Sequence, residues 1–341
     1  MFYKYNIENR RYTGSKEKLK LWIFELINKH CQGTSFLDLF AGTGVMSAEA
    51  LKYYNKIIIN DLLYSNEVIY NAFFLQSQFS EEKLTKYANL FNELIDKNIE
   101  DNFFSNNFGD KYFSKNDSKK IWFIRGEIEK AYLENLINQK EYYILLASLI
   151  YSSDKIADTV GHYDAYFKNK IKFDRFIFNL IKPLKIDNKT EILISRKDSN
   201  TLANEIQADI VYIDPPYNSR QYSRFYHVLE TIIDFKEKEL FGVAMKPEPQ
   251  NMSEYCKKNA PAIFDDLIQS LKSKYIIVSY NNTYNSKSGS SKNKITLEEI
   301  KDSLSKRGKV LEFEKEHKHF NAGNTNFNNH LELIFLVKVE N

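Results

Sequence analysis

The sequence predicts an α/β protein with a mostly parallel sheet. Short apolar runs that end in an acidic residue recur along the chain, and segments with helical spacing of apolar residues lie between them. Strands that alternate with helices pair in parallel, because each crossover returns the chain to the same edge of the sheet. A polar loop, and no helical segment, separates the last two runs, so one late hairpin is expected.

The first helix is expected at residues 16–29, where apolar residues such as Trp22, Ile23 and Leu26 recur at helical spacing. Strands are expected at residues 35–40, 56–61, 191–195, 209–214, 275–280, 310–314 and 331–339.

Residues 65–184 show helical periodicity without the alternation of a strand, and an Asn/Ser/Lys/Gly-rich loop is expected at residues 102–120. We therefore expect two domains. Residues 1–75 and 189–341 would form the sheet domain, and residues 76–188 an inserted, mostly helical domain.

Composition sets limits on the kind of protein. Of 341 residues, 43% are apolar, which is enough for a core, and a net charge of only +3 means that any affinity for nucleic acid must come from local patches. Cys31 and Cys256 lack partners at metal-ligand spacing, which favours a reducing cytosol. The longest apolar stretch, residues 142–151, is too short to span a bilayer, and no secretory segment follows Met1.

No metal site is expected. His317, His319 and His330 lie in a polar loop without supporting carboxylates or cysteines.

The most specific motif is Asp214-Pro215-Pro216-Tyr217. The preceding run, residues 208–213, predicts a buried strand that the prolines end, because proline cannot continue the hydrogen-bond ladder. Asp214 is thus placed at the carboxyl end of a strand, where open α/β sheets bind ligands. The carboxylate, the next backbone carbonyl and the Tyr217 ring could hold a planar base that carries an amino group. An ordinary Asp-Pro turn is the alternative.

A second motif joins a strand to a helix through a glycine turn. Residues 36–44, F-L-D-L-F-A-G-T-G, end in a turn that allows a ligand to approach the backbone closely. A phosphate-binding P-loop would need Gly-Lys-Ser/Thr after the turn, and a dinucleotide fingerprint would need glycine where the chain has Ser47. The turn suits a ligand with an amino-acid or sulfonium portion, and simple strand-to-helix packing is the alternative.

A third carboxylate, Asp61, ends the apolar run of residues 56–60. It lies about twenty residues after the glycine turn, where a carboxylate of a nucleotide-binding βαβ unit accepts from both ribose hydroxyls. Asp61 could also cap a helix that begins near Tyr64, and both roles could coexist.

Together these motifs resemble the Dam-like, D12-class (alpha group) DNA adenine-N6 methyltransferases. In that family an opening motif, here residues 11–16 (R-Y-T-G-S-K), precedes the glycine motif, and D-P-P-Y follows the target-recognition segment. Residues 209–222 and 157–168 (A-D-T-V-G-H-Y-D-A-Y-F-K) are similar to the FokI-type modification methylases, and the similarity is weakest at residues 76–156. The resemblance implies a Rossmann-like S-adenosylmethionine-dependent methyltransferase sheet, with the helical insertion as the target-recognition domain.

The resemblance also implies site residues. The catalytic motif would be Asp214, Pro215, Pro216 and Tyr217. The residues that would bind S-adenosylmethionine are Tyr12, Lys16, Asp38, Phe40, Ala41, Gly42, Thr43, Gly44, Asp61, Asp198 and Asp214. Ser199 or Asn200 could replace Asp198 as the contact to the adenine of the cofactor. The DNA contacts would be Arg220, Tyr222, Arg224, Thr159, His162, Tyr163, Lys287 and Lys292.

The implied activity is site-specific methyl transfer from S-adenosylmethionine to the N6 amine of adenine in double-stranded DNA, with the target base rotated out of the duplex. Such an enzyme would act as a cytoplasmic monomer that needs no stable protein partner, and as the modification component of a restriction-modification system. Whether a cognate restriction endonuclease exists does not follow from the amino-acid sequence.

Three alternatives remain open. They are N4-cytosine methylation, which D-P-P-Y in place of S-P-P-Y disfavours, methylation of adenine in RNA, and a catalytically silent DNA-binding module, against which the intact Asp38, Asp61 and Asp214 argue. The recognised base sequence does not follow from the amino-acid sequence.

Overall fold

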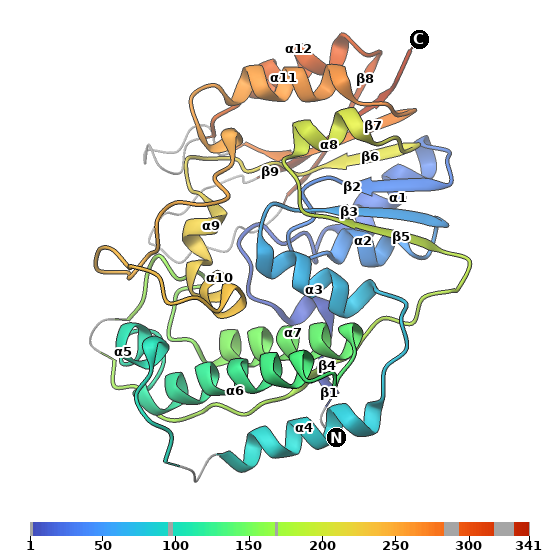
Figure 1. The fold of residues 1–341 in the computed structure, drawn as a ribbon. Helices are drawn as coiled ribbons and strands as arrows, with labels where there is room; N and C mark the ends of the chain where they lie inside the picture. Colours follow the sequence, from blue (N-terminus) through green and yellow to red (C-terminus); the bar gives the residue numbers. More distant parts are fainter. Residues whose placement is uncertain (1–2, 95–97, 168–169, 283–292, 317–330, 341) are drawn as a thin grey trace. The chain divides into compact units, whose positions relative to one another are not determined.

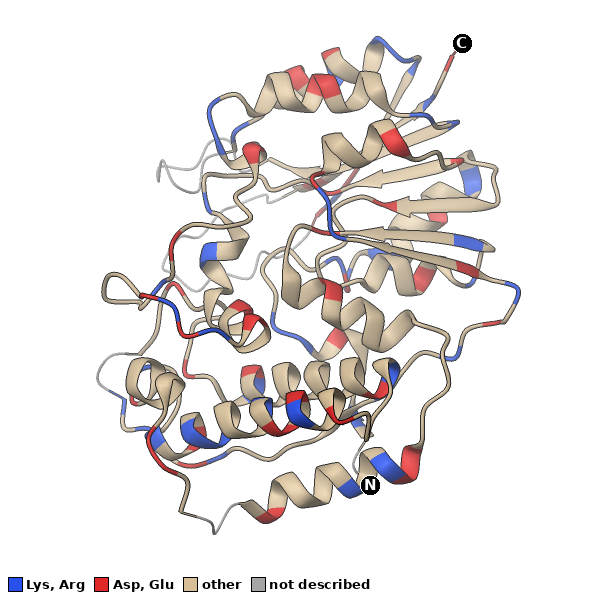
Figure 2. Ribbon diagram, in the orientation of Figure 1, with Lys and Arg blue, Asp and Glu red and all other residues tan. Residues whose placement is uncertain are grey.

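The structure of the chain, a computed structural model, describes residues 3–94, 98–167, 170–282, 293–316 and 331–340. The chain forms two compact units, and each is discontinuous in sequence. The first unit consists of residues 1–13, 63–186 and 223–250, and the second consists of residues 14–62, 187–222 and 251–341. Figure 1 labels their helices and strands, and Figure 2 marks the positions of their Lys, Arg, Asp and Glu residues.

The second unit is built on a seven-stranded sheet with the order β5-β3-β2-β6-β7-β9-β8. These strands are β2 (Ser35–Asp38), β3 (Lys56–Asn60), β5 (Glu191–Ser195), β6 (Ile210–Ile213), β7 (Tyr275–Asn281), β8 (Val310–Glu316) and β9 (Leu331–Lys338). The first five pair in parallel, whereas β9 runs antiparallel to both β7 and β8. The predicted α/β class, the seven predicted strands and the late hairpin are confirmed.

Helices cover both faces of this sheet. Leu37 and Val211 point to the face on which α8 (Ser199–Glu205), α11 (Ala260–Ser270) and α12 (Leu297–Ser305) pack. Phe36 and Tyr212, their neighbours along the same strands, point to the opposite face, because side chains alternate along a strand. There the Phe36 ring lies 5.5 Å from that of Phe24 in α1 (Lys20–His30), beside α2 (Val45–Ala50). The sheet is thus the middle of three layers (Figure 1).

The order of the sheet reverses between β2 and β6. From β2 the sheet continues through β3 to β5, whereas from β6 it continues through β7 in the other direction. In open α/β sheets, ligands bind outside the carboxyl ends of the strands at such a switch point. The glycine motif follows β2 and the D-P-P-Y motif follows β6, so the topology brings both to this edge.

The first unit is mostly helical. It contains α3 (Tyr64–Phe74), α4 (Glu81–Glu93), α5 (Phe103–Phe108), α6 (Lys115–Leu133), α7 (Gln139–Ile156) and α10 (His227–Asp234), with β1 (Tyr3–Tyr5) paired in parallel to β4 (Leu180–Ile181). The largely buried α7 packs against α3 and α6. The short helix η1 (Ile7–Asn9) also belongs to this unit, whereas η3 (Glu254–Cys256) belongs to the second unit, and α9 (Tyr222–Phe225) has its first residue in the second unit and the others in the first.

The boundaries of this unit differ from the predicted 76–188. It also includes the first thirteen residues, α3 and residues 223–250. The reason is packing: α10, which lies after the D-P-P-Y motif in sequence, contacts α3, α6 and α7.

The prediction of a loop at residues 102–120 is wrong, because α5 and the start of α6 occupy that segment. The Asn102 side chain accepts a hydrogen bond from the backbone N of Ser105 (3.0 Å), and Ser114 Oγ accepts one from the backbone N of Asp117 (3.0 Å). The polar residues that suggested a loop are therefore N-caps, which satisfy the free donors at helix starts.

One carboxylate holds the amino ends of β2 and β6 together. Asp209 Oδ2 accepts from the backbone N atoms of Thr34 (2.7 Å) and Ser35 (3.2 Å), and Lys274 Nζ lies 2.8 Å from Asp209 Oδ1. Partial burial raises the pKa of Asp209, but the Lys274 ammonium and the Thr34 and Ser35 donors outweigh it and hold this pKa well below its usual range.

Asp209→Ala is expected to lower the free energy of unfolding by about 1.5–3 kcal/mol at pH 7, the scale for hydrogen bonds to a charged group. Because the pKa of Asp209 is lower in the folded than in the unfolded chain, this contribution is present above the unfolded value, about 4, and is lost as the pH falls. Urea unfolding of the wild-type protein and of Asp209→Ala should show a difference in the free energy of unfolding that becomes smaller below about pH 4. An equal difference at pH 7 and pH 3 would contradict the assignment.

Candidate active site

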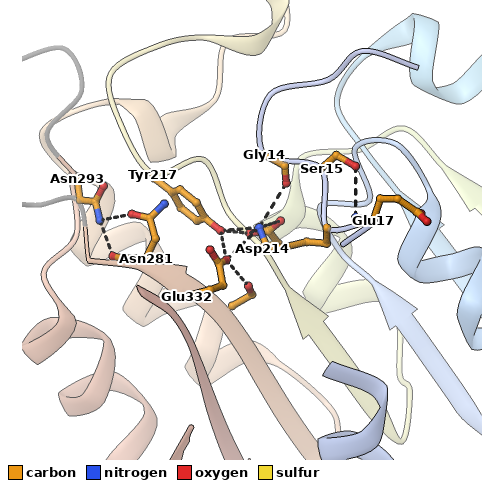
Figure 3. A network of polar contacts seen from close by, with 10 residues as sticks. Gly14, Ser15, Glu17, Asp214, Tyr217, Asn281, Asn293 and Glu332 are labelled. Carbon is orange, nitrogen blue, oxygen red and sulfur yellow. Dashed lines mark hydrogen bonds and ion pairs between the residues drawn. The ribbon is translucent and has the colours of Figure 1, made fainter. Parts of the chain in front are cut away.

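Asp214 is the first residue after β6, and its carboxylate is bound from two sides. Lys16 Nζ lies 2.9 Å from Oδ1 and 2.7 Å from Oδ2, and the Tyr217 hydroxyl donates to Oδ1 (Figure 3). Pro215 and Pro216 fix the backbone between the two residues, so Tyr217 turns back toward Asp214. The structure thus brings together three residues that the sequence placed in two distant motifs.

The Tyr217 ring is held in place by its neighbours. Its centroid lies 4.7 Å from that of Tyr280 in β7, at an interplanar angle of 70°, an edge-to-face arrangement. The backbone O of Tyr217 accepts from the backbone N of Lys294 (2.7 Å) and from the Tyr280 hydroxyl (3.4 Å). Lys16 Nζ lies 5.2 Å from the ring centroid.

Glu332, near the start of β9, completes this network. Its Oε1 lies 3.2 Å from Lys16 Nζ and accepts from the Tyr217 hydroxyl (3.2 Å) and Ser279 Oγ (3.0 Å). Sequence reasoning missed Glu332 because no motif surrounds it. The available signal was a single carboxylate inside the apolar run L-E-L-I-F-L-V, since charged residues are seldom fully buried without a partner.

Burial and charge pull the pKa values of this network in opposite directions. Burial lowers the pKa of Lys16, but the carboxylates of Asp214 and Glu332 raise it more, so Lys16 stays an ammonium ion. The pKa of Asp214 is raised, first by burial and also by Glu332, although Lys16 opposes this shift. The site therefore combines one fixed positive charge with a carboxylate that is more basic than usual.

The glycine turn after β2 lies beside a second carboxylate. Gly42 and Gly44 have φ angles of 54° and 77°, in the left-handed region that favours glycine. The backbone N of Gly42 donates to Asp61 Oδ2 (2.9 Å), which ties the end of β3 to the turn. The N-cap role considered for Asp61 is wrong, because α3 takes Leu63 as its N-cap residue.

Asp38 lies buried at the end of β2. Its Oδ2 accepts from the backbone N (3.1 Å) and Oγ (2.7 Å) of Ser47 in α2. Burial raises the pKa of Asp38 to about 7, and the charges of Asp214 and Asp61 act in the same direction against the Ser47 donors. Asp38 thus fixes the strand and the helix on either side of the turn, at a cost in charge burial.

The rest of the glycine motif is fixed by its neighbours. The Phe40 ring packs edge-to-face on Tyr255, with centroids 5.0 Å apart, the backbone N of Ala41 donates to the backbone O of Asn60 (2.9 Å), and Thr43 is buried.

Asp198 begins α8. One oxygen of its side chain accepts from the backbone N atoms of Asn200 (3.0 Å) and Thr201 (3.2 Å), so Asp198 is the N-cap of this helix. The Asn200 side chain accepts from the Tyr255 hydroxyl (2.7 Å) and donates to the backbone O of Ile263 (2.9 Å). Ser199 is buried.

The residues predicted to contact DNA lie in both units. In the second unit, Arg220 is exposed. Tyr222 begins α9, and its hydroxyl lies so near Gly14 that a Cβ atom at position 14 would be only 3.2 Å from it. Lys287 and Lys292 lie outside the described residues, as do His317, His319 and His330.

In the first unit, Tyr163 is completely buried and its hydroxyl donates to Asp154 Oδ1 (3.1 Å). We therefore exclude Tyr163 from the DNA contacts, because a core tyrosine cannot reach a duplex. The His162 ring stacks on Phe225 with centroids 4.2 Å apart, and Arg224 Nη1 donates to the backbone O of Pro247. Thr159 is buried and forms an isolated bridge with Tyr166.

The Tyr12 ring, predicted to touch the cofactor, stacks on Tyr226 with centroids 4.8 Å apart. Within the described residues, we find no helix with the length and hydropathy needed to cross a bilayer and no group of three His, Cys, Asp or Glu side chains that could hold a metal ion.

A family model described as D12 class N6 adenine-specific DNA methyltransferase matches residues 12–288. The chain belongs to this family.

Curated relatives agree with this assignment. The D12-class chain is 33% identical over 294 residues to modification methylase LlaI from Lactococcus lactis subsp. lactis, a match that covers 80% of this chain and 46% of the relative. It is 32% identical over 293 residues to type II methyltransferase M.FokI from Planomicrobium okeanokoites, covering 79% of this chain and 44% of the relative. It is also 33% identical over 343 residues to M.CviAII from Paramecium bursaria Chlorella virus 1, covering 96% and 98%.

The chain therefore spans less than half of the LlaI and FokI proteins and nearly all of M.CviAII. The predicted resemblance to the D12 class and to FokI-type methylases is confirmed.

In this D12-class protein, Asp38→Asn should raise the melting temperature at pH 8 and leave it nearly unchanged at pH 4. The pKa of Asp38 is about 7 in the folded chain, above the unfolded value, so the folded state holds more protons between the two values and loses stability as the pH rises. Asparagine retains an acceptor for Ser47 and removes the charge.

Thermal unfolding at both pH values measures this effect. Asp302→Asn, at an exposed position in α12, is the control for a charge change alone. A melting temperature of Asp38→Asn that is lower than wild type at pH 8 would contradict the account.

Proposed function

We propose that this chain is a site-specific DNA methyltransferase that transfers a methyl group from S-adenosylmethionine to the exocyclic N6 amine of adenine in duplex DNA. The observation that carries the proposal is the position of Asp214 and Tyr217 in a D-P-P-Y motif that follows β6, at the switch point of the sheet. Membership of the D12 class supports the choice of adenine as the methylated base.

The residues at the carboxyl edge of the sheet fit S-adenosylmethionine. Gly42 and Gly44 provide a turn without side chains, and no lysine follows the turn to favour a phosphate. Asp61 is partly exposed at the end of β3, where a carboxylate suits two ribose hydroxyls. The methionine portion would lie near Asp38 and Phe40, and the adenine portion near Asp198.

The bound cofactor would supply a methyl group on a positively charged sulfur. The adenine amine is a weak nucleophile because its lone pair is delocalised into the ring. Asp214 and the backbone carbonyl of Pro215 would accept the two amine hydrogens and localise that lone pair on the nitrogen. The raised pKa of Asp214 strengthens it as an acceptor.

The Tyr217 ring would stack on an adenine rotated out of the duplex. Its edge-to-face contact with Tyr280 and its bond to Asp214 hold the ring and the carboxylate in a fixed relation. The methylated nitrogen would be strongly acidic, so its proton would leave readily, and the Asp214 carboxylate could accept it.

We also propose that the mostly helical first unit reads the DNA sequence and that Arg220, Tyr222, Arg224 and His162 contribute contacts, whereas Thr159, like Tyr163, is buried and is left out. Arg224 is only partly buried, and its guanidinium suits a phosphate or a guanine edge. The enzyme would work as a cytoplasmic monomer and protect DNA from a cognate restriction endonuclease.

Asp214→Ala should reduce methyl transfer by about two orders of magnitude or more, because the amine loses the acceptor that activates it. Binding of duplex DNA should persist. Transfer of labelled methyl groups to DNA and a DNA-binding assay measure the two effects separately. Asp302→Ala, on the exposed face of α12, is the matched control. Activity of Asp214→Ala within tenfold of wild type would contradict the assigned role.

Asp61→Asn should weaken binding of S-adenosylhomocysteine by about 1.5–3 kcal/mol, the scale for losing hydrogen bonds to a charged acceptor. Asparagine keeps an oxygen for the backbone N of Gly42, so the turn is retained while the charge and the second acceptor are lost. Calorimetry that finds the wild-type affinity in this variant would refute the ribose contact.

A further inference from the structure

Glu332 is a buried carboxylate for which the known motifs give no role. It lies opposite Asn281 in the antiparallel pairing of β9 with β7, more than a hundred residues after the D-P-P-Y motif. Figure 3 shows its side chain directed at the Tyr217 hydroxyl and toward Asp214. Its side chain is only 5% exposed, as is that of Lys16.

The charges that the described residues contribute to this network do not balance. Lys16 is the single ammonium within salt-bridge distance of Glu332 among the described residues, and it also holds Asp214. Two carboxylates and one ammonium leave an excess of one negative charge in a buried place. Burying an unneutralised carboxylate is costly, so a residue that served only packing would be better neutral.

The excess charge lies where positive charge would develop. During methyl transfer the amine nitrogen becomes positively charged while its bond to the methyl carbon forms, and the sulfur loses its positive charge as its bond to that carbon breaks. A negative site next to the nitrogen stabilises that change.

Sharing Lys16 also changes what Asp214 can do. An ammonium has three N–H donors. If both Asp214 oxygens were committed to Lys16 and Tyr217, the adenine amine would compete for them. Glu332 offers both of these donors a second acceptor at 3.2 Å.

We propose that Glu332 is a positioning residue of the methyl-transfer site: it draws Lys16 and the Tyr217 hydroxyl toward itself when the target amine binds, so that Asp214 can accept the amine hydrogens. This inference rests on the proposed function and adds a residue to the same site.

Glu332→Gln should lower kcat at least about tenfold, because Lys16 then pairs with Asp214 alone. Dissociation constants for S-adenosylhomocysteine and duplex DNA should stay within twofold of wild type, since Glu332 itself contacts neither. Glu314→Gln, an exposed position on the neighbouring strand β8, is the matched control and should behave as wild type. A kcat of Glu332→Gln within twofold of wild type would overturn the proposal.

The pH profile separates positioning from a purely structural role. Among the described residues, the titratable groups that interact with Asp214 or Glu332 are Lys16, Tyr217, Tyr212 of β6 and Asp38 of β2. Because the charge of Glu332 raises the pKa of Asp214, Glu332→Gln should move the acid limb of kcat to lower pH even though kcat falls. Glu332→Asp retains the charge and should restore the wild-type limb. An acid limb that does not move in Glu332→Gln would contradict the inference.

A measurement that does not depend on catalysis tests the coupling between Glu332 and Asp214 even if the proposed function is wrong. Carbon-13 NMR of the aspartate carboxyl groups, with Asp214→Asn to assign the signal, gives the titration midpoint of Asp214 in the full chain. We expect a lower midpoint in Glu332→Gln than in wild type and no change in Glu314→Gln. An unchanged midpoint would refute the coupling, whereas absence of DNA methylation by the wild-type chain would refute only the proposed function.

Discussion

The candidate site depends on the ammonium of Lys16, which binds Asp214 and Glu332 and donates a hydrogen bond of 2.8 Å to the Tyr217 hydroxyl. Lys16 precedes α1, Asp214 follows β6 and Glu332 lies in β9, so one cation joins three segments that are far apart in sequence. Without it, two buried carboxylates would approach each other through the Tyr217 hydroxyl, and one of them would have to take up a proton. The Lys16 ammonium therefore opposes the rise in the pKa of Asp214 that burial and the charge of Glu332 cause, and so favours the ionised carboxylate that the proposed function needs.

The pKa values of the carboxylates are shifted in opposite directions at the two edges of the central sheet. At the amino edge, donors from Thr34, Ser35 and Lys274 lower the pKa of Asp209, and the charge stabilises the pairing of the strand ends. At the carboxyl edge, burial raises the pKa values of Asp38 and Asp214. Stability is thus gained at one edge, and the other holds carboxylates in costly surroundings, as sites built for binding and chemistry commonly do.

Much of the second unit was predictable because its strands are short apolar runs with clear ends, and parallel pairing brings those ends to one edge. Lys16, Asp61 and Asp214 could be found because each lies in or beside a motif. Glu332 could not be found in this way, because its position depends on how β9 pairs with β7, which no local pattern specifies. The boundaries of the compact helical unit differ from the predicted 76–188 for a similar reason: α10 packs with helices that precede it by more than seventy residues. At residues 102–120, the polar composition predicted a loop, whereas Asn102 and Ser114 are the N-caps of two helices.

The most direct test of the central claim, that Asp214 activates an adenine amine in DNA, is modified-base sequencing of DNA from cells that express this chain, with cells that express Asp214→Ala as the reference. It reveals the methylated atom and the sequence around it in one experiment. The account predicts N6-methyladenine at one recurring sequence in the first DNA and none there in the second. N4-methylcytosine at a recurring site, or DNA with the same modifications in both, would contradict it.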